Sequence, residues 1–297
     1  MDIRNEIAIF NNCYLDFVRR IEHKNYIYYN NASFAMMVGN EIFSGNIAES
    51  TQIYWKEILM RTHFTSVTSM LRNNKWINGI ELSIESENLL VFASTLRGFL
   101  EAVSDSYFSL SSAATGLAEN FCNIEKSIIG KQNRFFTAGG LEEDLLHFEF
   151  ASKNDKSGLP NNKPLNVSTY IESIDLFGDA KIKELYSILC ELSHPSSKSV
   201  TCFTSTIKDG DNGYILTCNN LDKQRIITIL QDYQNSVIYL LKLSFATPLA
   251  CLKVMNLFNF EDVKSSYIQD CMFNKLIGDN GWNNFQKLID NSGEIID

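Results

Sequence analysis

The amino-acid sequence predicts a mainly α protein, a multi-helix bundle with at most one small β-hairpin near residues 199–218. Apolar residues recur at steps of three and four along several segments, which is the spacing of one helical face. Only 4 prolines and 15 glycines occur in 297 residues, too few for the tight turns that an all-β chain requires. We expect one helical domain over 1–297, in which 221–297 forms a C-terminal helical extension.

The first two helices are predicted from their apolar spacing. Residues 3–23 carry apolar side chains at helical intervals, and a polar, aromatic stretch and a glycine-containing loop follow them. A second helix is expected over 49–73, where Ser50 and Thr51 are candidates for the N-terminal cap. Trp76 is then placed in the connecting turn.

Residues 87–108 form the clearest amphipathic segment of the chain. The opposite face of this segment is polar and carries Arg97 and Glu101, which helical spacing places one turn apart. We therefore expect a helix with one face in the core and a charged row along the other. The apolar positions, three and four residues apart, are Leu89, Phe92, Leu96, Leu100, Val103 and Tyr107.

The middle of the chain is expected to hold two further helices and then the longest loop. A short helix should precede Gly130, and another should follow 137–140, where carboxylates in its first turn complement the exposed N–H groups. This second helix runs through His147 to Ala151. Residues 152–168 hold two prolines and many polar residues, so they are predicted to form a loop.

The C-terminal part returns to helical spacing. Residues 180–194 predict a helix that stops before a proline, so His194 lies at its C-terminal end. Residues 199–218 alternate in polarity, which indicates either a β-hairpin or an irregular loop. A long helix is expected over 224–245. Pro248 either kinks this helix or begins the next one, and two terminal helices complete the chain.

The chain is acidic, which bears on its partners. Its formal net charge is -9, from 26 Lys and Arg against 35 Asp and Glu, and such a field repels phosphate backbones and anionic lipid headgroups. We expect the partner to be another protein or a second copy of the chain. Residues 237–258 are apolar, but Lys242, Lys253 and Pro248 interrupt them, so no membrane association is expected.

The cysteine pattern indicates a reducing compartment. The chain has 7 cysteines, an odd number, widely spaced and without a CxxC pair. Most are expected to be small buried hydrophobic residues. No secretory signal opens the sequence, so we expect a cytoplasmic protein. No HExxH, no local His and Cys cluster and no glycine-rich phosphate loop occurs, so neither a metal nor a cofactor is expected.

Four polar residues on helical segments are candidates for a shared catalytic or binding site. Arginine, histidine and carboxylates together handle proton transfer and stabilise a developing anion. The alternative is structural: Arg97 and Glu101 form an ion pair within one helix, and His194 caps a helix end, where the helix dipole stabilises a cation. Whether the protein is an enzyme stays open. The candidates are Arg97, Glu101, His147 and His194, with Glu191 beside the last.

Three sequence strings resemble a group of poorly characterised bacterial helical proteins. More distantly, an Arg/Glu helix with a helix-end His resembles the HEPN superfamily, whose active members are metal-independent ribonucleases of toxin–antitoxin and phage-defence systems. The HEPN ribonucleases carry Arg and His on one helix, further apart in sequence than the nearest pair here, Arg19 and His23, which three residues separate. The strings are Leu-Arg97-Gly-Phe-Leu-Glu101, Glu-Asp144-Leu-Leu-His147-Phe-Glu-Phe and Leu-Tyr186-Ser-Ile-Leu-Cys-Glu-Leu-Ser-His194-Pro-Ser.

The resemblance implies a HEPN-like helical core and a bacterial protein of stress response or phage defence. Two functions are then expected to compete. In the first, the protein is a non-catalytic binding or regulatory component of such a system. In the alternative, it is a HEPN-like metal-independent ribonuclease effector, and only then is RNA a partner.

Overall fold

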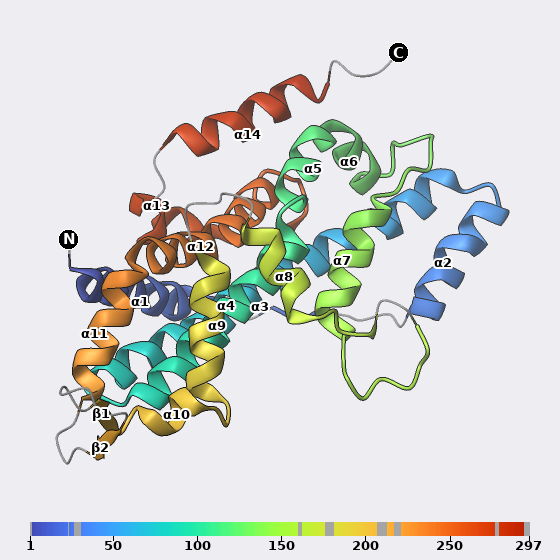
Figure 1. Ribbon diagram of the computed structural model, residues 1–297. Helices are drawn as coiled ribbons and strands as arrows, with labels where there is room; N and C mark the ends of the chain where they lie inside the picture. Colours follow the sequence, from blue (N-terminus) through green and yellow to red (C-terminus); the bar gives the residue numbers. More distant parts are fainter. Residues whose placement is uncertain are drawn as a thin grey trace. The chain divides into compact units, whose positions relative to one another are not determined.

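The computed structural model describes residues 2–22, 24–26, 31–159, 162–175, 181–206, 213–216, 221–276 and 279–293. Helices dominate this part of the chain, so the prediction of a mainly α protein is confirmed (Figure 1). The α-helices are α1 (Ile3–Arg20), α2 (Asn31–Phe43), α3 (Ile47–Glu85), α4 (Leu89–Leu110), α5 (Ala113–Glu119), α6 (Phe121–Ile128), α7 (Gly139–Phe150), α8 (Val167–Ile174), α9 (Ile182–Ser193), α10 (Ser197–Thr201), α11 (Asp222–Asp232), α12 (Gln234–Met255), α13 (Phe273–Leu276) and α14 (Asp279–Asn291). Two 3-10 helices, η3 (Glu261–Val263) and η4 (Ser266–Asp270), and two strands, β1 (Thr204–Thr206) and β2 (Tyr214–Leu216), complete the set.

The chain divides into two compact units, and each is assembled from three stretches of sequence. Both units draw on the region 221–297 that the sequence set apart as an extension, and the expectation of one helical domain stays a prediction. Unit 1 consists of Met1–Leu15, Leu71–Asp105 and Asn166–Ser244; unit 2 consists of Asp16–Met70, Ser106–Leu165 and Phe245–Asp297.

The core of unit 1 lies on the faces that helical spacing predicted. In α4, Phe92, Leu96 and Leu100 of the predicted apolar row are fully buried. In α9, Leu185 and Leu189 are likewise buried. Each helix therefore hides one face and leaves the other for polar residues, as expected of an amphipathic helix.

A small β-hairpin is present where the sequence allowed one. β1 and β2 pair antiparallel, with Ser205 opposite Ile215. The ladder is short, and both Ile215 and Leu216 are exposed. The hairpin therefore belongs to the surface of unit 1 and leaves the mainly α assignment intact.

The helix predicted over 49–73 is shorter at both ends than the observed helix α3. α3 begins before Ser50 and Thr51, whose hydroxyls donate to the Ile47 carbonyl at 2.9 and 2.8 Å. These side chains bond backwards inside the first turn of the helix and do not cap it, which is the common alternative for Ser and Thr within a helix.

α3 also continues through Trp76, which the sequence placed in a turn. Ile77 and Ile80 keep the apolar face of the helix buried beyond residue 73. The Trp76 ring lies over Gly98 of α4, where a Cβ atom would come within 2.5 Å of it. The absence of a side chain at Gly98 therefore lets the indole pack against α4.

The structure has a helix, α2, in the region after the first helix where the sequence predicted only a polar, aromatic stretch and a glycine-containing loop. In α2, Phe34 and Val38 are buried one turn apart, which gives the helix an inward face. Met36 and Phe43 are apolar yet exposed. These exposed apolar residues hide the helical period in the sequence.

The long helix predicted over 224–245 is two helices. α11 ends at Asp232, and the next residue, Tyr233, leaves the helical region with φ -116° and ψ 25°. Pro248 lies inside α12, so it does not begin a new helix. Among the described helices, α12 is long and apolar enough to cross a membrane by length and composition, but more than half of its apolar stretch is buried, as in a core helix.

Buried aromatic side chains and the buried histidine His63 characterise the core of unit 2. Nδ1 of His63 lies 2.7 Å from the Tyr26 hydroxyl and Nε2 lies 2.7 Å from the Ser265 hydroxyl, so both ring nitrogens are satisfied. Burial lowers the pKa of His63 to about 3. The ring is therefore a neutral core histidine. The largest fully buried aromatic residues in the unit are Phe17, Phe258 and Phe273.

Most of the described cysteines are buried, as expected of small hydrophobic residues, and the reducing compartment stays a prediction. Every described cysteine is free, and Cys13, Cys202, Cys251 and Cys271 are buried. Cys218 lies outside the described residues.

Candidate functional site

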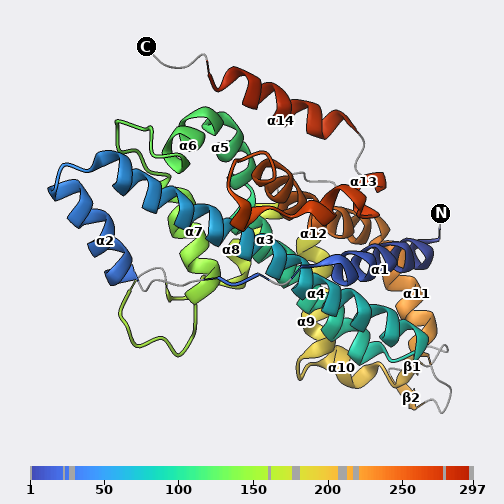
Figure 2. The same cartoon turned by 180° about the vertical axis from the view of Figure 1, so that it is seen from behind.

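Helices α4 and α9 present the candidate site on their polar faces in unit 1. Arg97 and Glu101 stand one turn apart on α4. Ser193 is the last residue of α9, and His194 follows it with the extended angles φ -109° and ψ 161°. The two helices lie side by side in both views (Figures 1 and 2). The proline after His194 ends the helix and leaves the ring at its C-terminal end.

Arg97 is the centre of a hydrogen-bond network. Its Nη1 atom donates to the Ser193 hydroxyl and to Nε2 of His194, both at 2.7 Å. Its Nε atom lies 3.1 Å from Oε1 of Glu101. Because an arginine nitrogen only donates, Nε2 of His194 must be the acceptor, and the proton of the neutral ring then sits on Nδ1.

Tyr186 extends the network on the α9 side. Its hydroxyl donates to Oε1 of Glu101 at 3.1 Å. Burial, a hydrogen bond with Cys190 and the Glu101 charge all raise the pKa of Tyr186. The phenol therefore stays protonated and acts as a donor that holds the carboxylate beside Arg97.

The network is open to solvent and retains hydrogen-bonding capacity. The Arg97 side chain is 23% exposed and that of Glu101 is 31% exposed, and His194 is exposed. Among the described residues, none has a recorded bond to Nη2 of Arg97, Nδ1 of His194 or Oε2 of Glu101. The site thus offers two donors next to a guanidinium charge, with one carboxylate oxygen beside them.

Of the four predicted site residues, three meet and the fourth belongs to the other unit. The structure brings together Arg97, Glu101 and His194. His147 lies in unit 2, where it is buried with its ring 6.3 Å from that of Phe108. Convergence of all four on one site stays a prediction.

Glu191 has a different neighbour from the one expected. Its carboxylate pairs with Lys198 of α10, so it belongs to the α9–α10 junction. Tyr186 and Ser193, in contrast, were not selected from the sequence although they join the network. Their spacing of seven residues places them on the same face of α9 as Cys190. This spacing was the signal in the sequence that could have grouped them.

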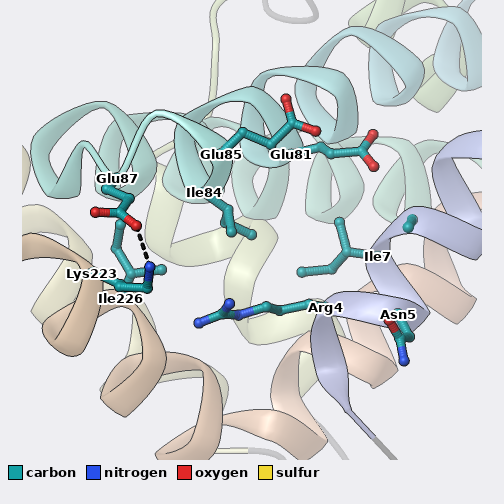
Figure 3. Close-up of a pocket in the computed structure, with 10 residues that line it drawn as sticks. Arg4, Asn5, Ile7, Glu81, Ile84, Glu85, Glu87, Lys223 and Ile226 are labelled. Atoms are coloured by element: carbon teal, nitrogen blue, oxygen red, sulfur yellow. Dashed lines mark hydrogen bonds and ion pairs between the residues drawn. The ribbon is translucent and has the colours of Figure 1, made fainter.

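A second polar feature of unit 1 is a cavity of about 370 Å³ that the sequence did not predict. Glu81 and Glu85 from α3 and Arg4 from α1 line it, and Glu87 pairs with Lys223 across one end (Figure 3). Glu87 has a positive φ of 50°, which is uncommon for a residue with a side chain. Charges of both signs therefore line an open cavity.

Comparison with known proteins gives no match. No protein-family model matches the chain, and neither the curated proteins nor the solved structures contain a match. Within the described residues no group of His, Cys, Asp and Glu is arranged to hold a metal ion. His23, the partner of Arg19 in the nearest HEPN-like pair, lies outside the described residues.

Proposed function

We propose that the protein is a non-catalytic binding or regulatory component of a bacterial stress or phage-defence system. Its recognition site is the cluster of Arg97, Glu101, Tyr186, Ser193 and His194, hereafter the Arg97 cluster. The cluster binds an anionic group, a carboxylate or a phosphate, presented by a partner protein. The contact between Nη1 of Arg97 and Nε2 of His194 carries this proposal.

The contact favours binding over catalysis. A general base needs a lone pair directed at the substrate, but His194 already uses its acceptor nitrogen for Arg97. What the cluster still offers is Nη2 of Arg97 and the Nδ1–H group of His194. Donors of this kind on an arginine recognise paired anionic oxygens.

Oε2 of Glu101 narrows the chemical class of ligand that we expect. This oxygen lies in the same network and accepts hydrogen bonds. An isolated anion gains nothing from it, whereas a ligand with a hydroxyl or amide N–H beside its anionic oxygens engages both signs. A carboxylate next to a peptide N–H, or a phosphorylated side chain, meets this description.

The overall charge supports a protein partner. A chain with a net charge of -9 repels the repeating phosphates of nucleic acid. A single anionic group on a folded partner avoids most of that repulsion. The assignment to stress response or phage defence rests on the family resemblance, whose strings contain Arg97, Glu101, Tyr186 and His194.

One observation favours the alternative, a HEPN-like metal-independent ribonuclease. Arg97 and His194 are 97 residues apart in sequence but in direct contact, which supplies an Arg–His pair from two helices. In that case Glu101 would be the base and His194 would have to release Arg97 before acting.

Cleavage of total RNA, measured with and without a chelator, separates the two functions. We expect no cleavage by the wild-type protein in either buffer. Metal-independent cleavage that disappears in folded Arg97→Ala and His194→Ala variants would establish the ribonuclease and overturn the binding proposal.

Co-expression with the genomic neighbours tests the binding function itself. The wild-type protein should co-purify with one neighbour, and Arg97→Ala should lose it. Arg72→Ala is the matched control, because it also removes a partly exposed arginine from an ion pair in unit 1, that with Asp105. Equal retention of the partner by both variants would remove the Arg97 cluster from the interface.

A further inference from the structure

Unit 2 contains a cavity of about 430 Å³ between α2, α3 and α7. These helices lie together in both ribbon views (Figures 1 and 2). Phe34, Val38 and Ile42 line it from α2, and Leu146 lines it from α7. The volume falls within the range of about 300–1,000 Å³ that small-molecule sites occupy.

Aromatic rings shape one side of the cavity. The rings of Phe34 and Tyr54 are stacked, with centroids 6.1 Å apart and an interplanar angle of 26°. Phe135 meets Tyr54 edge-on at 5.7 Å. The surface suits a flat or aliphatic ligand body, and the faces of such rings attract a cation.

One of the residues that line the cavity is a carboxylate held in a fixed position, Glu142. The Tyr54 hydroxyl donates to Oε2 of Glu142 at 3.0 Å and accepts the backbone N–H of Ala138 at 3.0 Å. Tyr54 is buried, so this arrangement holds Glu142 in place. Among the described cations none is recorded in an ion pair with Glu142.

Arg61 is the one cation among the described residues that line the cavity, and its charge is already compensated. The buried Arg61 guanidinium lies 2.7 Å from Glu57 and 2.6 Å from Glu149. With Glu142, three carboxylates therefore accompany one guanidinium. Burial raises the pKa of Glu57 and of Glu149 despite the opposing effect of Arg61. A neighbouring carboxylate raises each pKa further, Glu142 that of Glu57 and Glu57 that of Glu149. An anionic ligand would add to that excess, and a cationic ligand would relieve it.

We propose that this cavity binds a small organic cation, a primary or secondary amine on an aromatic or aliphatic body. The ammonium group pairs with Glu142, and the body lies along Phe34, Tyr54 and Val38. The cavity and the Arg97 cluster share no described residue. The proposal for the cavity therefore does not depend on the function proposed for the Arg97 cluster.

Isothermal titration calorimetry with 2-phenylethylamine tests the proposal. 2-Phenylethanol and 3-phenylpropanoate share the aromatic body, but the first is neutral and the second is an anion. We expect saturable binding of the amine, at least about tenfold weaker binding of the alcohol and none of the acid, since about 1.4 kcal/mol corresponds to tenfold. Absence of saturable amine binding, or tighter binding of the acid, would overturn the proposal.

Two variants locate the site. Glu142→Gln keeps an acceptor for Tyr54 but removes the charge, so it should weaken amine binding at least about tenfold and leave the alcohol unchanged. Glu143→Gln is the control, because this neighbour is exposed and does not line the cavity. Unchanged amine binding in Glu142→Gln would exclude the assigned ion pair.

Gly39→Leu provides a test that does not touch the charges. Gly39 lines the cavity, and a Cβ atom at this position meets no atom within 4 Å. The leucine side chain should therefore occupy ligand space without disturbing α2, and replacing glycine within a helix favours helix formation. We expect a folded protein that no longer binds the amine. A folded Gly39→Leu protein with unaltered affinity would place the amine elsewhere.

Discussion

The side-chain amide of Asn73 donates to the backbone carbonyl of Ser244 at 2.9 Å, deep in the core of unit 1. Within α12 this is the carbonyl four residues before Pro248, which has no N–H group to bond it. An asparagine from α3 thus replaces the donor that the proline lacks. This bond explains how α12 accommodates Pro248 as a continuous helix.

Replacing Asn73 by alanine should destabilise the protein by about 1–3 kcal/mol, because the Ser244 carbonyl is left buried without a donor. Urea denaturation measures the change. Asn120→Ala is the control, since its amide makes a similar bond, 2.9 Å to the Gly116 carbonyl, at an exposed position. The loss should shrink when Asn73→Ala is made in a Pro248→Ala background, which restores the helical donor. Equal losses in both backgrounds would contradict this account of the bond.

Gly98→Ala should destabilise the packing of α3 against α4. The added Cβ atom would lie 2.5 to 2.8 Å from atoms of the Trp76 ring, and overpacking of this kind costs about 1–3 kcal/mol. Gly116→Ala in α5 is the matched substitution, because its Cβ meets no atom within 4 Å. That variant should gain up to about 1 kcal/mol from helix propensity. In thermal melts, the melting temperature should fall in Gly98→Ala and rise in Gly116→Ala. A rise in both variants would show that the Trp76 ring can move aside without destabilising the protein.

His63 should make the protein acid-sensitive. Burial lowers its pKa from 6.5 to about 3, so the unfolded chain binds the proton more readily between these values. Stability is therefore lost as the pH falls from about 6.5, at a slope of up to about 1.4 kcal/mol per pH unit. His63→Gln should flatten this slope in denaturation curves recorded from pH 7 to pH 4. An unchanged slope would assign the acid sensitivity to other groups.

Asp144 should act in the opposite direction. Burial raises its pKa from 3.8 to about 6, so the folded state binds the proton more readily, and stability falls as the pH rises from about 4 to about 6. Asp144→Asn should be more stable than the wild type above pH 6, by on the order of 1 kcal/mol because the group is only half-buried. The two proteins should converge near pH 4. Glu143→Gln, at an exposed neighbour, should show no such crossover.

Local signals in the sequence predicted the two helices that carry the Arg97 cluster, and the candidate site grouped Arg97 and Glu101 with His194, but spacing alone does not say which atoms of the two helices meet. The pairing of Arg97 with Glu101 follows from their i, i+4 spacing, and the position of His194 at a helix end follows from Pro195. Which face of α9 meets α4 depends on tertiary packing. Whether His147, which lies in unit 2, joins the cluster depends on tertiary packing in the same way and stays a prediction.

Features that depend on several segments were not predictable. The cavity of unit 2 is partly formed by α2. The sequence did not predict this helix, because the exposed apolar residues Met36 and Phe43 obscure its helical spacing. The length of α3 was underestimated because Trp76 packs over a glycine that lies 22 residues away. Spacing within one segment carries no information about such a partner.

The most direct test of the Arg97 cluster is a titration of inorganic phosphate into nitrogen-15-labelled protein, following the side-chain N–H signals of Arg97 and the ring of His194. The account predicts a His194 ring protonated on Nδ1 and saturable shifts of both residues. Arg97→Lys should abolish these shifts, because lysine keeps the charge but lacks the second nitrogen for paired recognition. A His194 ring protonated on Nε2, or phosphate shifts that persist in Arg97→Lys, would contradict the account.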